Sequence, residues 1–130
     1  AFVSHSTFGQ PLTSRTKHIR SAVEILKEKK VDFEFDGDMQ PDVALNPEYE
    51  ELYPFAKIVG KANILIMPGQ HSAAISYKLM KTIGDAKVIG PLLIGLGLPI
   101  EIAPLRSSTS EILNLASIAA YSADVIDYKK

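Results

Sequence analysis

The sequence predicts an α/β protein in which a mainly parallel sheet carries helices on both faces. Short runs rich in aliphatic residues, interrupted or ended by Pro and Gly, have the composition of buried strands; they occupy residues 64–67, 87–93 and 100–103. Longer segments whose apolar residues recur at helical spacing lie before, between and after them. Strands that alternate with helices in this way are typical of parallel sheets buried on both faces.

Three segments are predicted to be helices. The first spans residues 13–30, with Thr13 or Ser14 as its cap, and the second spans residues 72–83. A third helix follows Ser108, which forms the capping-box pattern S-x-x-E with Glu111. The predicted apolar faces are Ile19, Ala22, Val23 and Leu26 in the first helix, Ile75, Leu79 and Ile83 in the second, and Ile112, Leu115, Ala116 and Ala119 in the third.

Two more strands are predicted near the amino terminus, over Phe2–Ser4 and Val31–Phe35. The second alternates apolar and acidic residues, as a half-exposed strand does. The Asp36-Gly37-Asp38 sequence that follows it is predicted to turn the chain. Further along, Asn46-Pro47 favours a short helix over residues 48–52, since proline suits the first turn of a helix.

Length and composition favour a single globular domain with a core of its own. The 130 residues contain no cysteine, which excludes disulfides and thiolate metal sites and fits a cytoplasmic protein. A formal net charge of −1 argues against nucleic acid or an anionic membrane as partner. The chain starts without Met or a signal peptide and ends in a polar, basic stretch over residues 126–130, so we expect a carboxy-terminal piece of a longer protein.

No metal site or catalytic triad is predicted. The acidic segment that begins at Asp36 is spaced like the start of a calcium loop, but Pro41 and Pro47 stand where an EF-hand needs Gly and a bidentate Glu. An acidic turn is the better interpretation. The three histidines, His5, His18 and His71, share no metal-ligand spacing, and each is predicted to be a surface or hydrogen-bonding residue. A triad has no G-x-S-x-G elbow to support it.

The polar loop after the first strand is a candidate anion site. Ser4, Ser6 and Thr7 precede Gly9, and hydroxyls at a strand end can donate to a phosphate together with backbone amides. An ordinary polar turn explains the same residues. Both interpretations stay open from these residues alone.

Five ordered segments resemble the phosphate acetyltransferase/phosphate butyryltransferase family, especially the transferase-like carboxy-terminal domain of bacterial NADP-dependent malic enzymes. They are Ser4–Gly9, Asp36–Ala44, Gly60–Pro68, Val88–Pro91 and Gly95–Pro99. Several matches in order are more specific than a lone short motif. The resemblance implies one domain over residues 1–130 with a three-layer α-β-α fold, of the isocitrate/isopropylmalate dehydrogenase-like superfamily.

One departure from the family pattern bears on catalysis. The transferases carry a Ser-Arg-Gly triplet after the last strand, and its Arg neutralises charge that develops at the reacting carbonyl. An ungapped alignment places Pro104, Leu105 and Arg106 there. We therefore expect no catalytic residue in this chain. The resemblance implies a site for acetyl-CoA or phosphate formed by Ser4, Ser6, Thr7 and Arg106.

The resemblance implies a non-catalytic regulatory and oligomerisation domain of a malic enzyme that senses acetyl-CoA. The parent enzyme would oxidise malate to pyruvate and carbon dioxide with NADP and Mg²⁺ or Mn²⁺, using amino-terminal domains of the same chain, and this domain would need no cofactor of its own. We expect a cytoplasmic homo-oligomer, a dimer or larger, to which Leu113, Tyr121, Val125 and Ile126 add apolar surface. The alternatives are a fragment of an active phosphate acetyltransferase and a stand-alone ligand-binding module.

Overall fold

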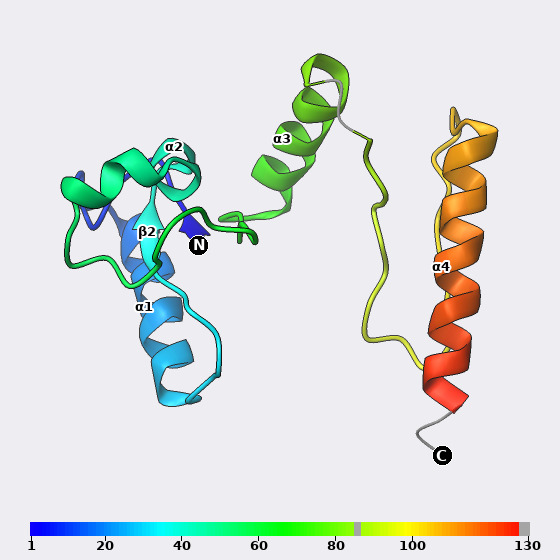
Figure 1. Ribbon diagram of the computed structural model, residues 1–130, viewed down its shortest axis with the longest axis horizontal. Helices are drawn as coiled ribbons and strands as arrows, with labels where there is room; N and C mark the ends of the chain where they lie inside the picture. Colours follow the sequence, from blue (N-terminus) through cyan, green and yellow to red (C-terminus); the bar gives the residue numbers. More distant parts are fainter. Residues whose placement is uncertain (85–86, 128–130) are drawn as a thin grey trace. The chain divides into compact units, whose positions relative to one another are not determined.

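The computed structural model describes residues 1–84 and 87–127 (Figure 1). The chain forms two compact units, one of residues 1–79 and one that begins at Met80. The elements in chain order are β1 (Phe2–Val3), α1 (Ser14–Glu28), β2 (Gly37–Met39), α2 (Pro41–Leu45), the 3₁₀ helix η1 (Pro47–Glu51), α3 (Gln70–Ile83) and α4 (Thr109–Asp127). The chain end predicted at residues 128–130 lies outside the described residues.

A small parallel sheet organises the first unit. The β1 strand pairs with β2 in parallel, with Phe2 opposite Gly37 and Val3 opposite Met39. On its other side β1 is bridged to Ile66: the backbone N–H of Val3 donates to the carbonyl of Ile66 at 2.8 Å. The predictions of a strand at Phe2–Ser4 and of parallel pairing are confirmed. The predicted strand at 64–67 is reduced to this single bridge.

The predicted strand over 31–35 is wrong, and so is the turn predicted after it. The strand that pairs with β1 starts at Gly37, because the N–H of Phe2 donates to the carbonyl of Asp36 and the N–H of Ser4 to that of Met39. Gly37 makes this approach possible: its φ is +151°, and a Cβ there would lie 2.6 Å from the carbonyl oxygen of Phe2. Alternation of apolar and acidic residues placed the strand a few residues before the segment that pairs with β1, because pairing depends on a partner that is distant in the sequence.

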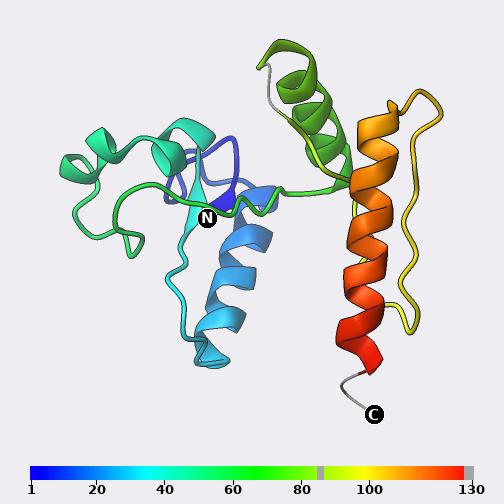
Figure 2. The same cartoon turned by 45° about the vertical axis from the view of Figure 1, so that its right-hand side comes forward.

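Helix α1 lies beside β2 and confirms the first predicted helix (Figures 1 and 2). Thr13 caps it, and a capping box joins Thr13 to Thr16. Val23 is buried at the centre of the predicted apolar face. Each of these features was readable from local sequence, because capping and helical periodicity involve only residues within a turn or two.

The segment between β2 and α3 supplies the rest of the core. Helix α2 was not predicted, whereas the short helix expected over 48–52 corresponds to η1. Met39, Ala44 and Ala62 form the buried cluster, with Phe8 and other half-buried residues packed against it. The core of this unit therefore sits beside the carboxyl end of β2.

The second unit is dominated by α4, which confirms the third predicted helix. Residues 100–106 run alongside α4 in both views (Figures 1 and 2). Leu115 is buried, but the predicted strands 87–93 and 100–103 have no ladder partner among the described residues. The sheet of the described chain is thus smaller than predicted.

Helix α3 confirms the second predicted helix, but its apolar face is largely exposed, with Ile83 79% accessible. Among the described residues, no helix combines the length and the hydropathy that crossing a bilayer needs.

Candidate functional site: a histidine-lined hollow beside the Ser4–Gly9 loop

The Ser4–Gly9 loop is fixed over β2 by two side chains. The Ser6 hydroxyl donates to Oδ2 of Asp38 at 2.5 Å, and the Gly9 N–H reaches the same oxygen at 3.3 Å. Gln40 donates from Nε2 to the carbonyl of His5 at 2.8 Å. These contacts hold the loop at the carboxyl ends of β1 and β2, the edge at which parallel sheets usually bind ligands.

The three hydroxyl residues predicted as ligands take different positions in this loop. Ser6 is fully buried, with its hydroxyl on Asp38. The Thr7 hydroxyl is buried and accepts from the N–H of Gln40 at 3.2 Å. Ser4 is mostly buried too, but it lines an open hollow on the surface of this unit. The structure therefore places one of the three residues, Ser4, in the lining of a cavity that a ligand can enter.

This hollow has a volume of about 730 Å³ and lies within the first unit. It is formed where the Ser4–Gly9 loop, the first turns of α1, the start of α2 and the first turns of α3 meet. The volume falls in the range of small-molecule sites. Its polar lining residues are Ser4, His5, Arg15, His18, His71, Ser72 and Ser76, and no acidic residue is among the described residues that line it.

Sequence reasoning missed this constellation. All three histidines of the chain line the one hollow, although they lie on a loop, on α1 and on α3. Their separations match no helical or metal-ligand spacing, so no local signal could join them; only the tertiary structure does. They do not form a metal centre: no group of three or more His, Asp or Glu among the described residues could hold an ion.

Arg106, the fourth predicted ligand, lies in the second unit. It sits in a turn closed by a 2.9 Å hydrogen bond from the N–H of Ser107 to the carbonyl of Pro104. The side chain of Leu105, the residue before Arg106, is fully exposed. The turn thus presents an aliphatic side chain to solvent.

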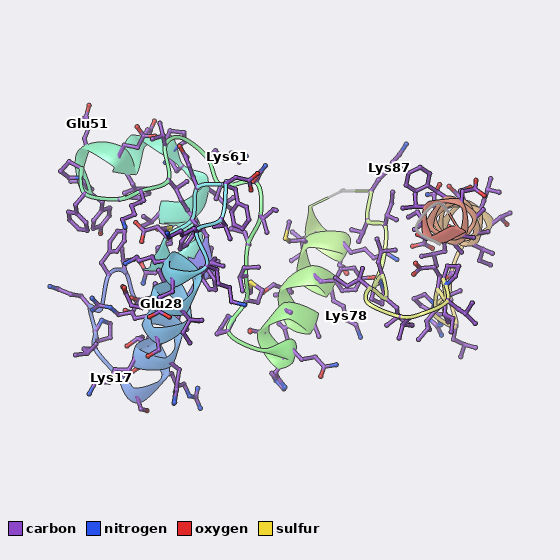
Figure 3. The ribbon with its side chains drawn as sticks, turned by 90° about the horizontal axis from the view of Figure 1, so that it is seen from below. Lys17, Glu28, Glu51, Lys61, Lys78 and Lys87 are labelled. Atoms are coloured by element: carbon purple, nitrogen blue, oxygen red, sulfur yellow. The ribbon has the colours of Figure 1, made fainter. Side chains whose placement is uncertain are left out.

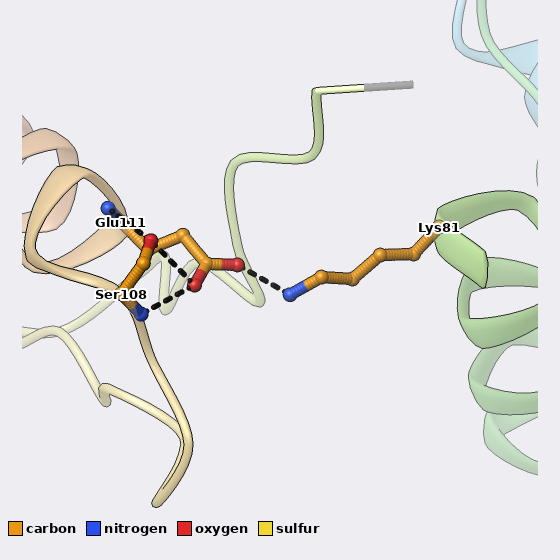
Figure 4. Close-up of polar contacts among 3 residues, drawn as sticks. All are labelled: Lys81, Ser108 and Glu111. Atoms are coloured by element: carbon orange, nitrogen blue, oxygen red, sulfur yellow. Dashed lines mark hydrogen bonds and ion pairs between the residues drawn. The ribbon is translucent and has the colours of Figure 1, made fainter. Parts of the chain in front are cut away.

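Glu111 has a structural role at the start of α4, as its capping-box pattern predicts. Its Oε2 accepts from the Ser108 backbone N–H at 2.7 Å and from the Ser108 hydroxyl at 3.0 Å, and its Oε1 meets the ammonium of Lys81 (Figure 4). The hydrogen bond from Lys81, followed by those from the backbone N–H and the hydroxyl of Ser108, lowers the pKa of Glu111 to about 2.

The polar groups that line the hollow can bind an anion. Hydroxyls, imidazoles and a guanidinium can all donate hydrogen bonds to an anion, and Arg does so with a planar fork that matches a phosphate. General acid–base chemistry of the kind that needs a carboxylate would have to draw it from outside the described lining.

Comparison with known proteins identifies the class. The sequence matches the phosphate acetyl/butaryl transferase family over residues 1–120, so the chain belongs to that family. The resemblance stated from the five motifs is confirmed.

Two individual relatives show which members of the family this chain is similar to. The chain is 49% identical to an NADP-dependent malic enzyme of Rhizobium meliloti (strain 1021), over 95% of this chain and 16% of that protein, in its carboxy-terminal part. It is 33% identical to the phosphate acetyltransferase of Bacillus subtilis (strain 168), over 95% of this chain and 38% of that enzyme.

A solved structure, the EutD phosphotransacetylase from Staphylococcus aureus, matches with a TM-score of 0.81 and 30% identity, over 94% of this chain and 38% of that one. The chain therefore has a phosphotransacetylase-like fold. It spans well under half the length of each of these proteins.

Proposed function

We propose that this chain is a non-catalytic regulatory and oligomerisation domain of an NADP-dependent malic enzyme and that it senses acetyl-CoA. What supports the non-catalytic part of the proposal is the ungapped alignment to the family pattern, in which Pro104 and Leu105 fall at the positions of the transferases' Ser and Arg; the Leu105 side chain is fully exposed. An aliphatic side chain offers no positive charge to a developing oxyanion. The likeness to the Rhizobium meliloti malic enzyme supports the parent's identity.

The parent enzyme, in this proposal, converts malate to pyruvate and carbon dioxide in the cytoplasm with NADP and a divalent metal, Mg²⁺ or Mn²⁺. Its catalytic domains lie in the part of the malic-enzyme relative that this chain does not cover. The whole chain assembles as a homo-oligomer through this domain.

The proposal also covers the three aliphatic segments that were predicted to be strands. Residues 64–67, 87–93 and 100–103 belong to no helix or strand of the described chain, and Ile64, Ile89 and Ile102 are more than half exposed. Aliphatic segments of this kind become buried strands when a sheet continues on either side of them. We propose that further residues of the parent pair with them and complete a three-layer α-β-α domain.

The proposed effector site centres on the hollow beside the Ser4–Gly9 loop. Ser4 lines it, and Ser6 and Thr7 give the loop its shape through Asp38 and Gln40. Arg106 is the proposed cation from the second unit. Regulation requires that active and inactive states of the parent differ in their affinity for acetyl-CoA, since equal binding shifts no equilibrium.

The test of the non-catalytic role is a transfer assay. Acetyl-phosphate and CoA mixed with this chain are expected to give no acetyl-CoA above a blank, while a phosphate acetyltransferase serves as the positive control. Turnover that disappears in an Arg106→Ala variant would overturn the proposal and would assign Arg106 the role of the missing arginine.

The second candidate function is a fragment of an active phosphate acetyltransferase, which moves acetyl between CoA and phosphate. The likenesses to the Bacillus subtilis enzyme and to EutD favour it. Two measurements on the parent enzyme separate the two candidates: calorimetry with acetyl-CoA and an assay of malate turnover. A regulatory domain binds acetyl-CoA and changes malate turnover, but it does not consume the acetyl-CoA. Affinity that is unchanged in both Ser6→Ala and Arg106→Ala would place the effector site elsewhere.

A further inference from the structure

The hollow beside the Ser4–Gly9 loop collects every histidine of the chain. His5 enters it from the loop after β1, His18 from α1 and His71 from the start of α3, and Arg15 joins them from the first turn of α1. All four residues are exposed to solvent. Groups from three separate segments of the sequence therefore face one open cavity, and all four are basic.

No carboxylate is among the described residues that line the hollow. Asp38 of β2 is fully buried and accepts from Ser6 and Gly9, and Asp42 of α2 is not among the lining residues, although its neighbour Pro41 is. The remaining described lining residues are apolar, hydroxylic or glycine. Histidine is the side chain whose charge changes most readily near neutral pH. The three imidazoles, together with Arg15, are therefore the groups through which protons and a bound anion would influence each other.

We propose that this hollow is a proton-linked oxyanion site: it binds a doubly charged oxyanion, such as a phosphate group, more tightly as His5, His18 and His71 become protonated. Each added proton supplies a positive charge and a further N–H donor, and hydrogen bonds between charged partners are the strong ones. By linkage, the bound anion favours the protonated imidazoles in the same measure. That the anion belongs to acetyl-CoA rests on the proposed function.

The hollow is sized for more than a bare anion, since about 730 Å³ exceeds what one phosphate fills. Ile19, Ile75 and Met67 line it beside the basic groups. The phosphate of a larger ligand with an apolar part, and free inorganic phosphate, share the chemistry that the basic residues recognise. The experiment must therefore separate these two sources.

Sulfate is the first probe, because it keeps two charges across the pH range in which phosphate gains a proton. Calorimetry on this chain at constant ionic strength is expected to show an affinity at least about fivefold higher at pH 5.5 than at pH 8, within the usual range of coupling between two sites. A single His→Gln change at each position is expected to reduce this ratio, and Arg15→Gln to weaken binding at both pH values.

The matched control is Lys17→Gln. Lys17, labelled in Figure 3, lies on α1 as Arg15 and His18 do. It is not among the residues that line the hollow. The Lys17→Gln change removes a positive charge from the same helix. It is expected to leave the ratio of the sulfate affinities at pH 5.5 and pH 8 unchanged. Equal affinity at both pH values, or a loss in Lys17→Gln as large as that in Arg15→Gln, would overturn the proposal.

Proton NMR gives a second, independent measurement. Because the chain has three histidines and all line the hollow, every histidine C–H signal reports on this site. Sulfate is expected to move the titration midpoints of the histidines to higher pH. The three shifts should add up to about 0.7 pH unit, which is the logarithm of a fivefold ratio between the sulfate affinities at low and high pH. Midpoints that sulfate does not move would refute the linkage.

Acetyl-CoA is the second probe and tests the source of the anion. Displacement of sulfate by acetyl-CoA, with the same pH dependence, assigns the site to a phosphate of the effector. If acetyl-CoA binds without displacing sulfate, the oxyanion site stands and the proposed placement of the effector fails. If acetyl-CoA binds with no pH dependence and sulfate does not bind, the oxyanion site fails and the proposed function stands.

Discussion

Ser6 and Asp38, 32 positions apart in the sequence, meet in a 2.5 Å hydrogen bond between two fully buried side chains. This bond ties the loop that follows β1 to β2 and so fixes one wall of the histidine-lined hollow. A buried hydrogen bond to a carboxyl group is worth more than an exposed one, because its loss leaves a polar group without water or partner.

Replacing Ser6 by Ala is therefore expected to lower the free energy of unfolding by about 1–3 kcal/mol. Ser21→Ala is the control: that hydroxyl is exposed and bonds only to the carbonyl of Lys17 one turn earlier. Urea unfolding followed by circular dichroism measures both. A Ser6→Ala loss no larger than that of Ser21→Ala would show that the bond with Asp38 adds nothing to stability.

The close approach of β1 and β2 predicts a large effect at Gly37. An alanine Cβ would lie 2.6 Å from a backbone oxygen of Phe2, and the φ of +151° disfavours any side chain. Gly37→Ala is expected to destabilise the chain by more than about 2 kcal/mol. Gly97→Ala makes the same chemical change where nothing lies within 4 Å, and thermal unfolding of the two variants should differ clearly. Matching melting temperatures would contradict the strand pairing described here.

The environment of Glu111 predicts a stability change at acidic pH. Its pKa in the folded chain is about 2, below the ordinary value of 4.5, because it accepts hydrogen bonds from Lys81 and Ser108. A carboxylate whose pKa is lowered by folding stabilises the fold above its unfolded pKa, and this contribution is lost as pH falls from about 4.5 to about 2. Glu111→Gln should lower the melting temperature at pH 7 and have no such effect at pH 2.

Carbon NMR of the Glu111 carboxyl checks the cause. Lys81→Met should raise its titration midpoint more than Ser108→Ala does, since the hydrogen bond from Lys81 is the largest contribution. Glu51→Gln, in η1 of the other unit, is the control and should leave the midpoint unchanged. A midpoint near 4.5 in the unmodified chain would disprove the contact drawn in Figure 4.

Self-association is expected through the apolar residues of α4. Leu113 and Tyr121 are 66% and 72% exposed, and Val125 is also exposed; the side chain of Ile126 lies outside the described part. Two-fold dimers are the commonest homo-oligomers, and a stable one buries roughly 1,000 Å² or more. Light scattering at micromolar concentration should report particles larger than 14.2 kDa.

A double variant, Leu113→Lys with Tyr121→Lys, should restore the monomer mass. Ile25→Lys is the control, because Ile25 is an exposed apolar residue of α1 in the other unit. Monomers in the unmodified chain would refute the expectation, and equal effects of both changes would show that the association is not specific to α4.

The three long helices, and the caps of α1 and α4, could be predicted from the sequence. Thr13 and Ser108 act on backbone groups three residues away, so the signal and the structure occupy the same short window. Strand positions were harder. Residues 31–35 look like a strand, yet β1 pairs from Gly37, because pairing depends on a partner distant in the sequence. The resemblance to the transferase family came from motifs distributed along the chain and did not require the fold.

The sequence by itself thus determined the three long helices α1, α3 and α4 and the family, because each is written in residues close together or in a fixed order. Only the tertiary structure decided which hydroxyl of the Ser4–Gly9 loop faces a cavity and that His5, His18 and His71 share it. The physical reason is that the parallel sheet and the packing of α1 and α3 bring together residues whose separations in the sequence carry no period.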